Sequence, residues 1–510
     1  MSEASIGAIL DRLYYEAETQ RDKGTAFERL VQAFLRTDPT YAARFDEVWM
    51  WSQWPDRGVR PDRGIDLVAR HRDGSGLCAV QCKFYDPERA VTKADVDTFL
   101  AESGSAEFAS RLVVSTTNRW NQAAEDTISR QAVPVTRIGL DDLFNSTLDW
   151  DAFSLDEPQE LKRTQGKTPR PHQVEAMDAV MEGLRSADRG KLIMACGTGK
   201  TFTALQIAQR MTQPEGGRVL FLVPSIALLS QTLREWMAEA SQPIRAFAVC
   251  SDAKVNKGRS SANEDISVVD LAIPATTDGA RLAGALKVPA PRTEVPGHVL
   301  HAAPMTVVFA TYQSIDVVHR AQEQGAPDFD LIICDEAHRT TGATVAGQDE
   351  SAFVRVHDAE YIRASKRLYM TATPRVYAAD VKDNAQRKDL VLASMDDEGI
   401  YGPELFRLGF GRAVEQGLLT DYKVLVLTVS EEQVSRTLQD SLASGGDIAL
   451  DDAARIVGCW NALAKQTQDP ADYEADPGPM RTAVAFASNI RASKRFAGSV
   501  GAVVEDYGWL

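Results

Sequence analysis

The sequence predicts an α/β protein of several domains, at least one of them built on a parallel sheet with helices on both faces. Three observations predict this. A length of 510 residues is several times what one core needs. The composition, 44% hydrophobic and 25% charged, is that of a soluble globular chain and excludes collagen, disorder and a disulfide scaffold. From about residue 169, short apolar runs alternate with helical patterns, which is typical of parallel sheets.

No segment approaches the roughly 18 apolar residues that a membrane helix needs. The segment from Met1 to Leu10 lacks the basic start and long apolar stretch of a secretion signal. We therefore expect a cytoplasmic protein without a membrane partner. Six cysteines are scattered without the paired spacing of zinc sites, and we expect reduced, mostly buried thiols: Cys78, Cys82, Cys196, Cys250, Cys334 and Cys459.

The formal net charge of −16 means that any contact with DNA must be local. Two stretches are basic enough for such a contact, and for both a solvated face is an equally good interpretation, since Asp56, Asp62 and Asp73 are interspersed in the first. They contain Arg57, Arg60, Arg63, Arg70 and Arg72, and Lys162, Arg163, Lys167 and Arg170.

The first domain is expected over residues 1–150 as a compact α/β unit. Thr25 can cap a helix whose apolar stripe begins at Phe27 and ends at Leu35. Strands are expected at Gly64 to Ala69, Leu77 to Phe84 and Arg111 to Ser115. Residues 151–168 are polar, have no apolar periodicity and are predicted to be a linker.

The second domain is expected over residues 169–400, followed by a connector and an incomplete second sheet domain over 401–510. Its strands are expected at Lys191 to Ala195, Arg218 to Val223, Thr306 to Ala310, Phe329 to Cys334 and Arg367 to Met370. Between Ser251 and Pro304 we expect a surface excursion. The last domain is expected to open with strands at Lys423 to Val429 and Arg481 to Ala487 and a helix from about Asn489.

A phosphate-binding loop follows the first strand of the second domain. Gly197, Thr198 and Gly199 let backbone N–H groups curl around a phosphate at a helix N-terminus, Lys200 neutralises the β and γ oxygens of ATP, and Thr201 can hold Mg²⁺. The loop departs from the full pattern because Met194 stands where the first glycine is expected.

Two further strands end in polar residues suited to phosphoryl transfer. Asp335 can bind the metal, and Glu336 can orient and deprotonate the attacking water. A later strand ends in Thr371 and Thr373. Because these loops lie at the carboxyl edge of one parallel sheet, they can converge on one nucleotide.

These residues resemble superfamily 2 helicases of the DEAH type, with RecA-like lobes. The resemblance implies an ATP-driven motor on double-stranded DNA. It implies that His338 couples the nucleotide site to Thr371 and Thr373, although a lone loop histidine is also commonly structural. It further assigns adenine reading to Arg170 and Gln173, for which a surface turn is the alternative.

Two more segments resemble the motifs of this family that touch the DNA backbone. They are Phe221 to Ser225, with Pro224 and Ser225, and Thr311 to Ser314, with Thr311 and Gln313; each could also be an ordinary strand end. The glycine-containing and arginine-rich motifs of the second lobe are not found after Asn489. We therefore expect a fragment of a longer protein that binds ATP but hydrolyses it poorly.

The first domain carries a pattern that suits DNA cleavage. Asp66 opens one strand and the next strand carries Gln81 and Lys83, which would bring a carboxylate, a carbonyl oxygen and an ammonium to one edge, with Glu28 as a further carboxylate. Oxygen ligands can hold Mg²⁺, and Lys83 can position or activate water. The alternative is a surface strand with alternating polar residues.

The order of these residues resembles the Mrr-like branch of the PD-(D/E)xK restriction endonucleases, in which a glutamine replaces the second acid. The fusion with the motor resembles type ISP restriction-modification enzymes. In those enzymes a methyltransferase and a target-recognition domain follow the motor, so both are expected partners.

Two other functions stay open. One is a repair-type helicase whose first domain only grips DNA. The other is a nucleotide-gated DNA-binding module without chemistry. The sequence does not reveal the DNA target, the direction of movement, the activity of the nuclease or the oligomeric state.

Overall fold

The computed structural model describes most of the chain up to residue 422 and short stretches beyond it. The described residues are 6–16, 19–59, 64–155, 157–158, 161–164, 166–251, 267–289, 303–345, 352–379, 381, 390–422, 459, 462–465, 480, 482–487, 492–494 and 496–498. The chain divides into two compact units, of which the first holds 1–258 and 264–419 and the second holds 259–263 and 420–510.

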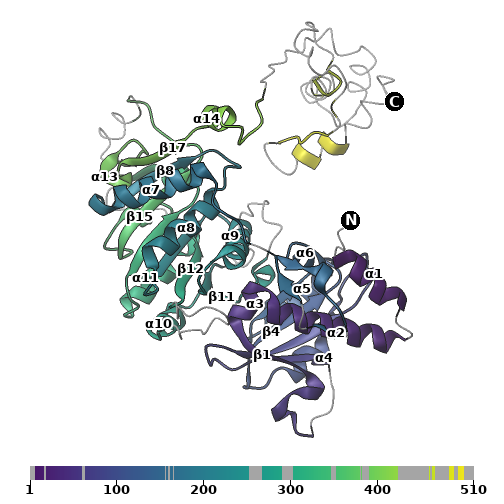
Figure 1. Cartoon of the computed structure of the whole chain (residues 1–510). Helices are drawn as coiled ribbons and strands as arrows, with labels where there is room; N and C mark the ends of the chain where they lie inside the picture. Colours follow the sequence, from purple (N-terminus) through teal and green to yellow (C-terminus); the bar gives the residue numbers. More distant parts are fainter. Residues whose placement is uncertain are drawn as a thin grey trace, which may run out of the picture. The chain divides into compact units, whose positions relative to one another are not determined.

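The N-terminal domain of the first unit is a five-stranded sheet flanked by helices (Figure 1). The strands are β1 (Phe45–Met50), β2 (Leu67–His71), β3 (Leu77–Lys83), β4 (Phe108–Ser115) and β5 (Val135–Ile138), in that spatial order. The first three pair antiparallel, and β3, β4 and β5 pair parallel. The helices are α1 (Ile6–Glu16), α2 (Gln20–Thr37), α3 (Pro39–Arg44), α4 (Lys93–Glu102), α5 (Gln122–Ser129) and α6 (Leu140–Phe144).

Helix α2 begins earlier than the sequence predicts. Its N-cap is Thr19, whose side chain accepts a hydrogen bond from the backbone N–H of Asp22. In return, the Asp22 carboxylate accepts a hydrogen bond from the backbone N–H of Thr19. This reciprocal cap stabilises a helix start better than Thr25 can, because Thr25 already lies within the helix. The apolar stripe from Phe27 to Leu35 is buried as expected.

The second domain of this unit is built on an eight-stranded, all-parallel sheet. Its strands in chain order are β8 (Arg189–Met194), β9 (Arg218–Val223), β10 (Ile244–Val249), β11 (Ala275–Thr276), β12 (Met305–Thr311), β13 (Phe329–Cys334), β15 (Ala364–Thr371) and β17 (Glu404–Leu408). In space the order is β11-β10-β12-β9-β13-β15-β8-β17. The five strands predicted for this domain are present, with ends shifted by at most three residues.

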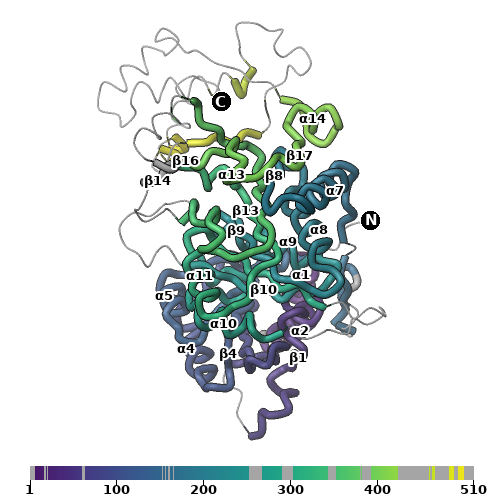
Figure 2. The backbone as a smooth tube through the Cα atoms, turned by 90° about the vertical axis from the view of Figure 1, so that its left-hand side faces the viewer, coloured from purple at the N-terminus to yellow at the C-terminus, as the bar shows by residue number. Residues whose placement is uncertain are grey.

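Helices cover both faces of this sheet. They are α7 (Pro171–Ser186), α8 (Lys200–Thr212), α9 (Ile226–Glu239), α10 (Gly279–Lys287), α11 (Ile315–Glu323), α13 (Glu398–Tyr401) and α14 (Phe410–Glu415). Alternate residues of β9 show the two layers: Phe221 packs in one core with α7, α8 and α9, whereas Leu220 packs in the other with α10 and α11. Figure 2 shows α7 and α11 on opposite sides of the strands.

Four domain-level predictions need correction. The boundary at residue 400 falls one strand too early, because β17 pairs with β8 and the unit continues to Leu419. The expected linker contains β7 (Lys162–Arg163), which pairs with β6 (Leu148–Asp149), and its Leu161 is buried in the shared core. An edge strand and a tethered segment bury few side chains, so their sequences look polar.

The excursion between Ser251 and Pro304 is also more structured than expected where it is described. It contains a short helical turn (Val268–Asp270), β11 and α10, and Leu271 and Ala272 are buried. In the second unit, residues 482–487 were expected to be part of a strand but form none, and no described residue pairs with them. The expected strand at Lys423 to Val429 and residue Asn489 lie outside the described residues.

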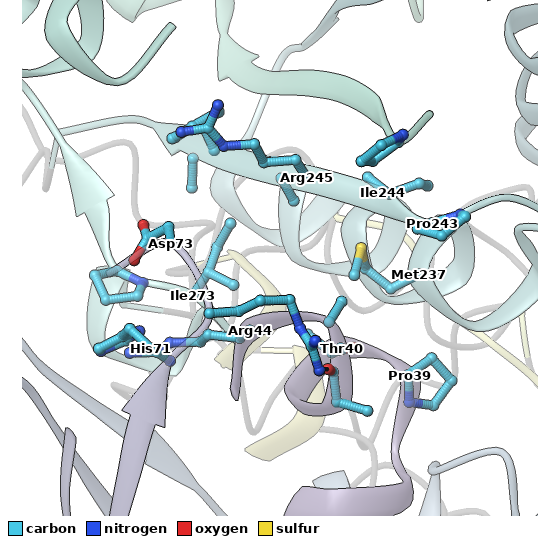
Figure 3. A pocket seen from close by; sticks show the side chains of 18 of the residues that line it. Pro39, Thr40, Arg44, His71, Asp73, Met237, Pro243, Ile244, Arg245 and Ile273 are labelled. Carbon is cyan, nitrogen blue, oxygen red and sulfur yellow. Dashed lines mark hydrogen bonds between the residues drawn. The ribbon is translucent and has the colours of Figure 1, made fainter. Parts of the chain in front are cut away.

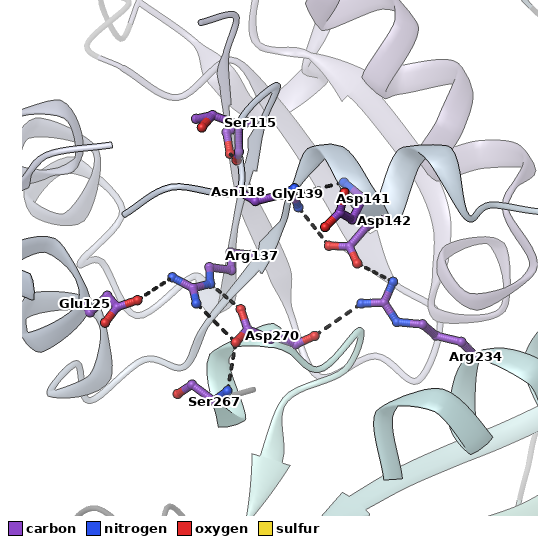
Figure 4. A network of polar contacts seen from close by, with 11 residues as sticks. Ser115, Asn118, Glu125, Arg137, Gly139, Asp141, Asp142, Arg234, Ser267 and Asp270 are labelled. Carbon is purple, nitrogen blue, oxygen red and sulfur yellow. Dashed lines mark hydrogen bonds and ion pairs between the residues drawn. The ribbon is translucent and has the colours of Figure 1, made fainter. Parts of the chain in front are cut away.

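The two domains of the first unit are joined by apolar packing and by a network of ion pairs and a hydrogen bond, here called the polar clasp. Val269 of the second domain packs in a core cluster of the first. Next to it, Asp270 pairs with Arg137 of β5, and Arg234 of α9 pairs with Asp142 of α6 at 2.5 Å. Arg234 also donates to the backbone oxygen of Asp270, so the contacts form a continuous chain (Figure 4).

None of the helices in the part of the chain that the structure describes has the length and apolar content that crossing a bilayer demands. The cysteines are free. Cys78, Cys250 and Cys334 are buried as expected, but Cys196 and Cys459 are exposed.

Candidate nucleotide and nuclease sites

The phosphate loop lies between β8 and α8, as the sequence predicts. Gly197 and Gly199 have φ of +81° and +83°, a region that side chains disfavour. A Cβ at Gly199 would lie 2.4 Å from Nε2 of Gln173, and a Cβ at Gly197 would lie 3.1 Å from a methyl carbon of Leu419. The loop is therefore shaped around glycine, with Lys200 at the N-terminus of α8. Such a terminus presents backbone N–H groups that suit a phosphate.

The three predicted loops follow three adjacent strands. In the sheet order, β13 neighbours β15 and β15 neighbours β8, so Asp335, Thr371 and the phosphate loop share the carboxyl edge. Lys200 begins α8 directly after the phosphate loop, and Asp335 directly follows β13, so both lie at this edge. Burial, reinforced by the charge of Glu336, raises the pKa of Asp335 to about 6 despite Lys200.

His338 contacts both sides of the expected coupling. Its Nδ1 lies 3.0 Å from Oγ1 of Thr371 and 3.2 Å from a carboxylate oxygen of Glu336. The backbone N–H of Thr373 donates to the same Thr371 hydroxyl at 3.1 Å. Burial lowers the pKa of His338. Thr371 is fully buried, whereas Thr373 is exposed, so only Thr371 bonds to the histidine.

Gln173 is held against the phosphate loop. Its Oε1 accepts from the backbone N–H of Arg170 at 2.8 Å, and its Nε2 donates to the carbonyls of Thr198 and Gly199 at 3.4 Å each. The Thr198 hydroxyl donates to the carbonyl of Ala195, and the Thr201 carbonyl accepts from the indole of Trp236. These bonds fix the loop, and adenine reading by Gln173 and Arg170 stays a prediction.

The two segments expected to touch DNA lie on adjacent strands, β9 and β12, and contact each other. Nε2 of Gln313 donates to the carbonyl of Pro224 at 3.4 Å, and Gln313 is exposed. Ser225 caps α9 through the backbone of Leu228. Thr311, in contrast, is buried and bonds to Ser314, so its hydroxyl faces the protein.

Sequence reasoning missed two residues at the nucleotide edge. Tyr312, fully buried, donates its hydroxyl to the carbonyl of Asp335 at 2.8 Å and so supports the loop after β13. Its position directly after Thr311 was the available signal. Leu419, the last residue of the first unit, lies over Gly197, and a distant leucine gives no signal of this contact in the sequence.

The first domain brings its predicted residues to one edge. Asp66 precedes β2, and one of its carboxylate oxygens accepts from the backbone N–H of Cys82 at 2.6 Å. Cys82 lies between Gln81 and Lys83 at the end of β3. Asp66, Gln81 and Lys83 therefore lie around the end of this strand, and Glu28 is on α2, which packs against β3.

Gln81 has an unused acceptor at this edge. Its Nε2 donates to the carbonyl of Gly64 at 3.1 Å, but its Oε1 is buried without a hydrogen-bond partner. A buried oxygen without a donor is unusual and destabilising unless another group satisfies it. Together with the Asp66 carboxylate, this oxygen is of the kind that Mg²⁺ prefers, so the residues present fit a divalent cation.

Lys83 lies in a partly buried environment that affects its pKa. Burial lowers the pKa of the Lys83 amine, while the nearby carboxylates of Asp66 and Asp95 oppose this effect. Asp95, which the sequence analysis missed, caps α4 and accepts a hydrogen bond from the Tyr85 hydroxyl at 2.8 Å. The signal for it was the capping pattern of Thr92 followed by Asp95. A lysine with a lowered pKa can act as a proton acceptor.

Groups of three or more His, Cys, Asp or Glu side chains that could hold a metal do not occur among the described residues. The end of β3 falls outside this definition, because one of its candidate oxygen ligands is the side-chain amide of Gln81. In the basic stretches, Arg70 pairs with Asp46 and Lys167 pairs with Glu239, whereas Arg60 and Arg63 lie outside the described residues.

Two family models match the chain. Residues 36–160 match a model described as restriction endonuclease, of the Mrr catalytic type. Residues 166–376 match the type III restriction enzyme, res subunit. Their boundary agrees with the division between the two domains of the first unit.

Individual relatives are also a restriction enzyme subunit and a probable helicase. The chain is 25% identical over 345 residues to the type I restriction enzyme EcoAI endonuclease subunit of Escherichia coli, covering 65% of this chain and 34% of that protein. It is 30% identical over 255 residues to a probable helicase of African swine fever virus, covering 50% of this chain and 24% of that protein.

Among solved structures, the chain is similar to the ATP-dependent type ISP restriction-modification enzyme LlaBIII bound to DNA. The TM-score is 0.79 at 38% identity, over 98% of this chain and 31% of that enzyme. The chain thus spans about a third or less of the length of these relatives. It carries, in one polypeptide, an Mrr-type restriction endonuclease domain and a helicase domain of the type III res-subunit family, in the fold of type ISP restriction-modification enzymes.

Proposed function

We propose that this chain is the nuclease and motor part of an ATP-dependent restriction enzyme that moves along double-stranded DNA and cuts it. The observation that carries the proposal is the assembly of two separate sites in one unit. One groups Lys200, Asp335 and His338 at the edge of the parallel sheet, and the other groups Asp66, Gln81 and Lys83 at the end of β3.

In the motor site, the glycine loop and Lys200 hold the phosphates of ATP, and Thr201 and Asp335 would hold Mg²⁺. Bound there, the cation would supply positive charge to the phosphates. Glu336 orients the attacking water and takes its proton, while the bond between the γ phosphorus and the bridging oxygen breaks. His338 passes the state of the site to Thr371 through the 3.0 Å contact.

In the nuclease site, Asp66 and Gln81 hold a divalent cation, with Glu28 nearby on α2. Lys83 positions the water that attacks a DNA phosphorus and accepts its proton when its amine is neutral. The P–O bond to the leaving sugar breaks, which leaves a phosphate on one end and a hydroxyl on the other. Pro224, Ser225 and Gln313 supply contacts to the DNA backbone for the motor.

We further propose that the enzyme works in the cytoplasm and that methyltransferase and target-recognition parts give it self-protection and sequence specificity. The similarity to LlaBIII, which is a restriction-modification enzyme, supports this. Neither part is needed for the two sites described above.

Paired variants test the proposal, with ATP binding and Mg²⁺-dependent DNA nicking as separate measurements. Lys200→Ala should weaken ATP binding and abolish ATP-dependent cleavage. Lys83→Ala should leave ATP binding unchanged and remove cutting. As matched controls, Lys366→Ala changes a lysine on β15 away from both sites, and Lys93→Ala changes an exposed lysine of the nuclease domain.

The outcomes separate the competing functions. Normal nicking by Lys83→Ala contradicts the nuclease site. Strand separation without any Mg²⁺-dependent nicking in the unmodified protein indicates a repair-type helicase instead. DNA affinity that changes with ATP, without phosphate release or nicking, indicates a nucleotide-gated DNA-binding module.

A further inference from the structure

A cavity of about 780 Å³ lies between the two domains of the first unit. Figure 3 shows Arg44 and His71 on the side of the nuclease domain and Ile244 and Arg245 on the side of the motor domain. Its volume falls in the range of small-molecule sites, which is about 300–1,000 Å³. Nothing in the ATP-driven cycle or the nuclease reaction uses it.

The cavity is far more positive than the chain around it. Five arginines line it: Arg44, Arg72, Arg163, Arg245 and Arg281. Asp73 is the one carboxylate among the described residues that line it. In a chain with a net charge of −16, this local excess of cations is the reverse of the overall balance. Such a concentration of one sign attracts ligands of the other sign.

Arg44 and Arg245 bond to neutral oxygens, which leave their charge in place. Arg44 donates to Oγ of Ser110 at 2.9 Å and to the carbonyl of Ala272 at 3.4 Å. Arg245 donates to the carbonyls of Ala285 and Val288 at 3.0 and 2.7 Å. These bonds fix the guanidinium groups in position, so a ligand would meet a prepared set of cations.

Burial makes this charge costly. Burial lowers the pKa of Arg44, Arg163 and Arg245, because their charged guanidinium groups are less hydrated than in water. Desolvation and Arg44 also lower the pKa of His71 to about 4, so its ring is neutral at pH 7. An anion between these arginines would restore the lost stabilisation.

Part of the remaining wall is apolar. Met237, Pro243, Ile244, Phe247 and Ile273 line the cavity beside the arginines. A small inorganic anion would leave these surfaces uncovered. A ligand that joins a phosphate to a flat, weakly polar ring would use both kinds of wall.

We propose that this cavity binds a nucleotide, through its phosphate on the arginines and its base on the apolar wall. The shared chemistry belongs to a free nucleotide and to a nucleotide within a DNA strand. The site is separate from the phosphate loop, because Pro243 and Pro304 precede β10 and β12 and mark the amino edge of the sheet, whereas Gly199 follows β8 at the carboxyl edge. The proposal does not depend on the reaction proposed above.

The test uses the full chain carrying Lys200→Ala, which removes binding at the phosphate loop. The probes are a fluorescent ADP and a labelled 12-nucleotide single strand. Arg281→Glu is the first variant, because Arg281 is exposed near the start of α10 and its replacement leaves the core intact. Lys287→Glu is the matched control: it makes the same charge change on the same helix, and Lys287 does not line the cavity.

Arg281→Glu should weaken binding of one probe by about tenfold, the loss expected for one charge-assisted contact replaced by repulsion, and Lys287→Glu should change it less than twofold. Arg245→Gln, checked for an unchanged melting temperature, should weaken the same probe. Weaker ADP binding identifies a free nucleotide, and weaker oligonucleotide binding identifies a DNA strand. Unchanged affinity for both probes, or an equal loss in the Lys287 variant, overturns the proposal.

Discussion

Arg137 of the nuclease domain donates two hydrogen bonds to the Asp270 carboxylate of the motor domain. Its Nη2 donates to Oδ2 at 3.1 Å, and its Nε donates to Oδ1. Both side chains are largely buried, at 13% and 22% exposed. Removing Asp270 leaves the largely buried Arg137 with Glu125 as its remaining carboxylate partner, at 3.2 Å, and this loss costs more than the loss of an exposed pair.

Asp270→Ala should therefore lower the free energy of unfolding by about 2–4 kcal/mol. Because the lost contacts lie between domains, the loss should also split one cooperative transition into two. Differential scanning calorimetry measures both effects. Arg185→Ala, which breaks an exposed pair with Glu182, is the control and should cost less than about 1 kcal/mol. A single unshifted transition for Asp270→Ala would contradict the clasp.

Thr371→Val should separate ATP binding from its consequences. Valine fills the same buried space but cannot bond to His338. We expect ATP affinity to stay within about twofold, while the effect of DNA on that affinity falls by about tenfold, since coupling between sites requires the link. Equilibrium titrations with and without duplex DNA measure this. Thr373→Val, at an exposed position, should behave like the unmodified protein, and equal effects of the two variants would argue against coupling through Thr371.

Gln81→Leu should remove nicking without unfolding the nuclease domain. The change deletes one hydrogen bond to Gly64 and at the same time removes the unpartnered Oε1. These effects oppose each other, so stability should change by no more than about 1 kcal/mol. Nicking assays and chemical denaturation are the two measurements. Persistent nicking would show that Oε1 is not a cation ligand.

Acidification should destabilise the motor domain through His357. Burial lowers the pKa of His357 to about 4, against 6.5 for the free side chain. Its Nε2–H donates to the carbonyl of Thr340, and its Nδ1 lies 3.0 Å from the hydroxyl of Tyr369. Since the folded state binds the proton less tightly, stability is complete above pH 6.5 and is lost as pH falls toward 4.

The loss reaches at most about 3 kcal/mol for this group. Chemical denaturation at several pH values measures it. His357→Gln should reduce the slope between pH 6.5 and 4, and an unchanged slope would assign the pH dependence to other groups. His71, whose pKa is also lowered to about 4, contributes a second part of the slope, which His357→Gln should leave in place.

The sequence predicts the parts of this fold that bury regular patterns. β9 and β13 match the predicted ranges residue for residue, because continuous apolar runs are required where both faces of a strand are covered. β17 was missed because an edge strand alternates exposed and buried residues, as Phe406 and Arg407 do. β10 was missed because Arg245, its second residue, interrupts the apolar run.

The candidate sites also contain residues that the sequence predicts and residues that it does not. Lys200 and Asp335 could be located from the sequence because Lys200 ends the glycine-containing loop after β8 and Asp335 directly follows the buried β13. Asp95 and Tyr312 each stand in a recognisable pattern, but their contacts with Tyr85 and with the carbonyl of Asp335 arise only in the folded chain. The cavity between the domains was also beyond prediction, because its arginines come from distant segments whose separate sequences look like ordinary surface.

The chain leaves the first unit at Leu419, whose methyl group lies against Gly197 in the phosphate loop. A side chain at position 197 would therefore meet Leu419 as well as the strain of a positive φ. The glycine requirement of the phosphate loop thus depends in part on the residue at which the chain leaves the unit.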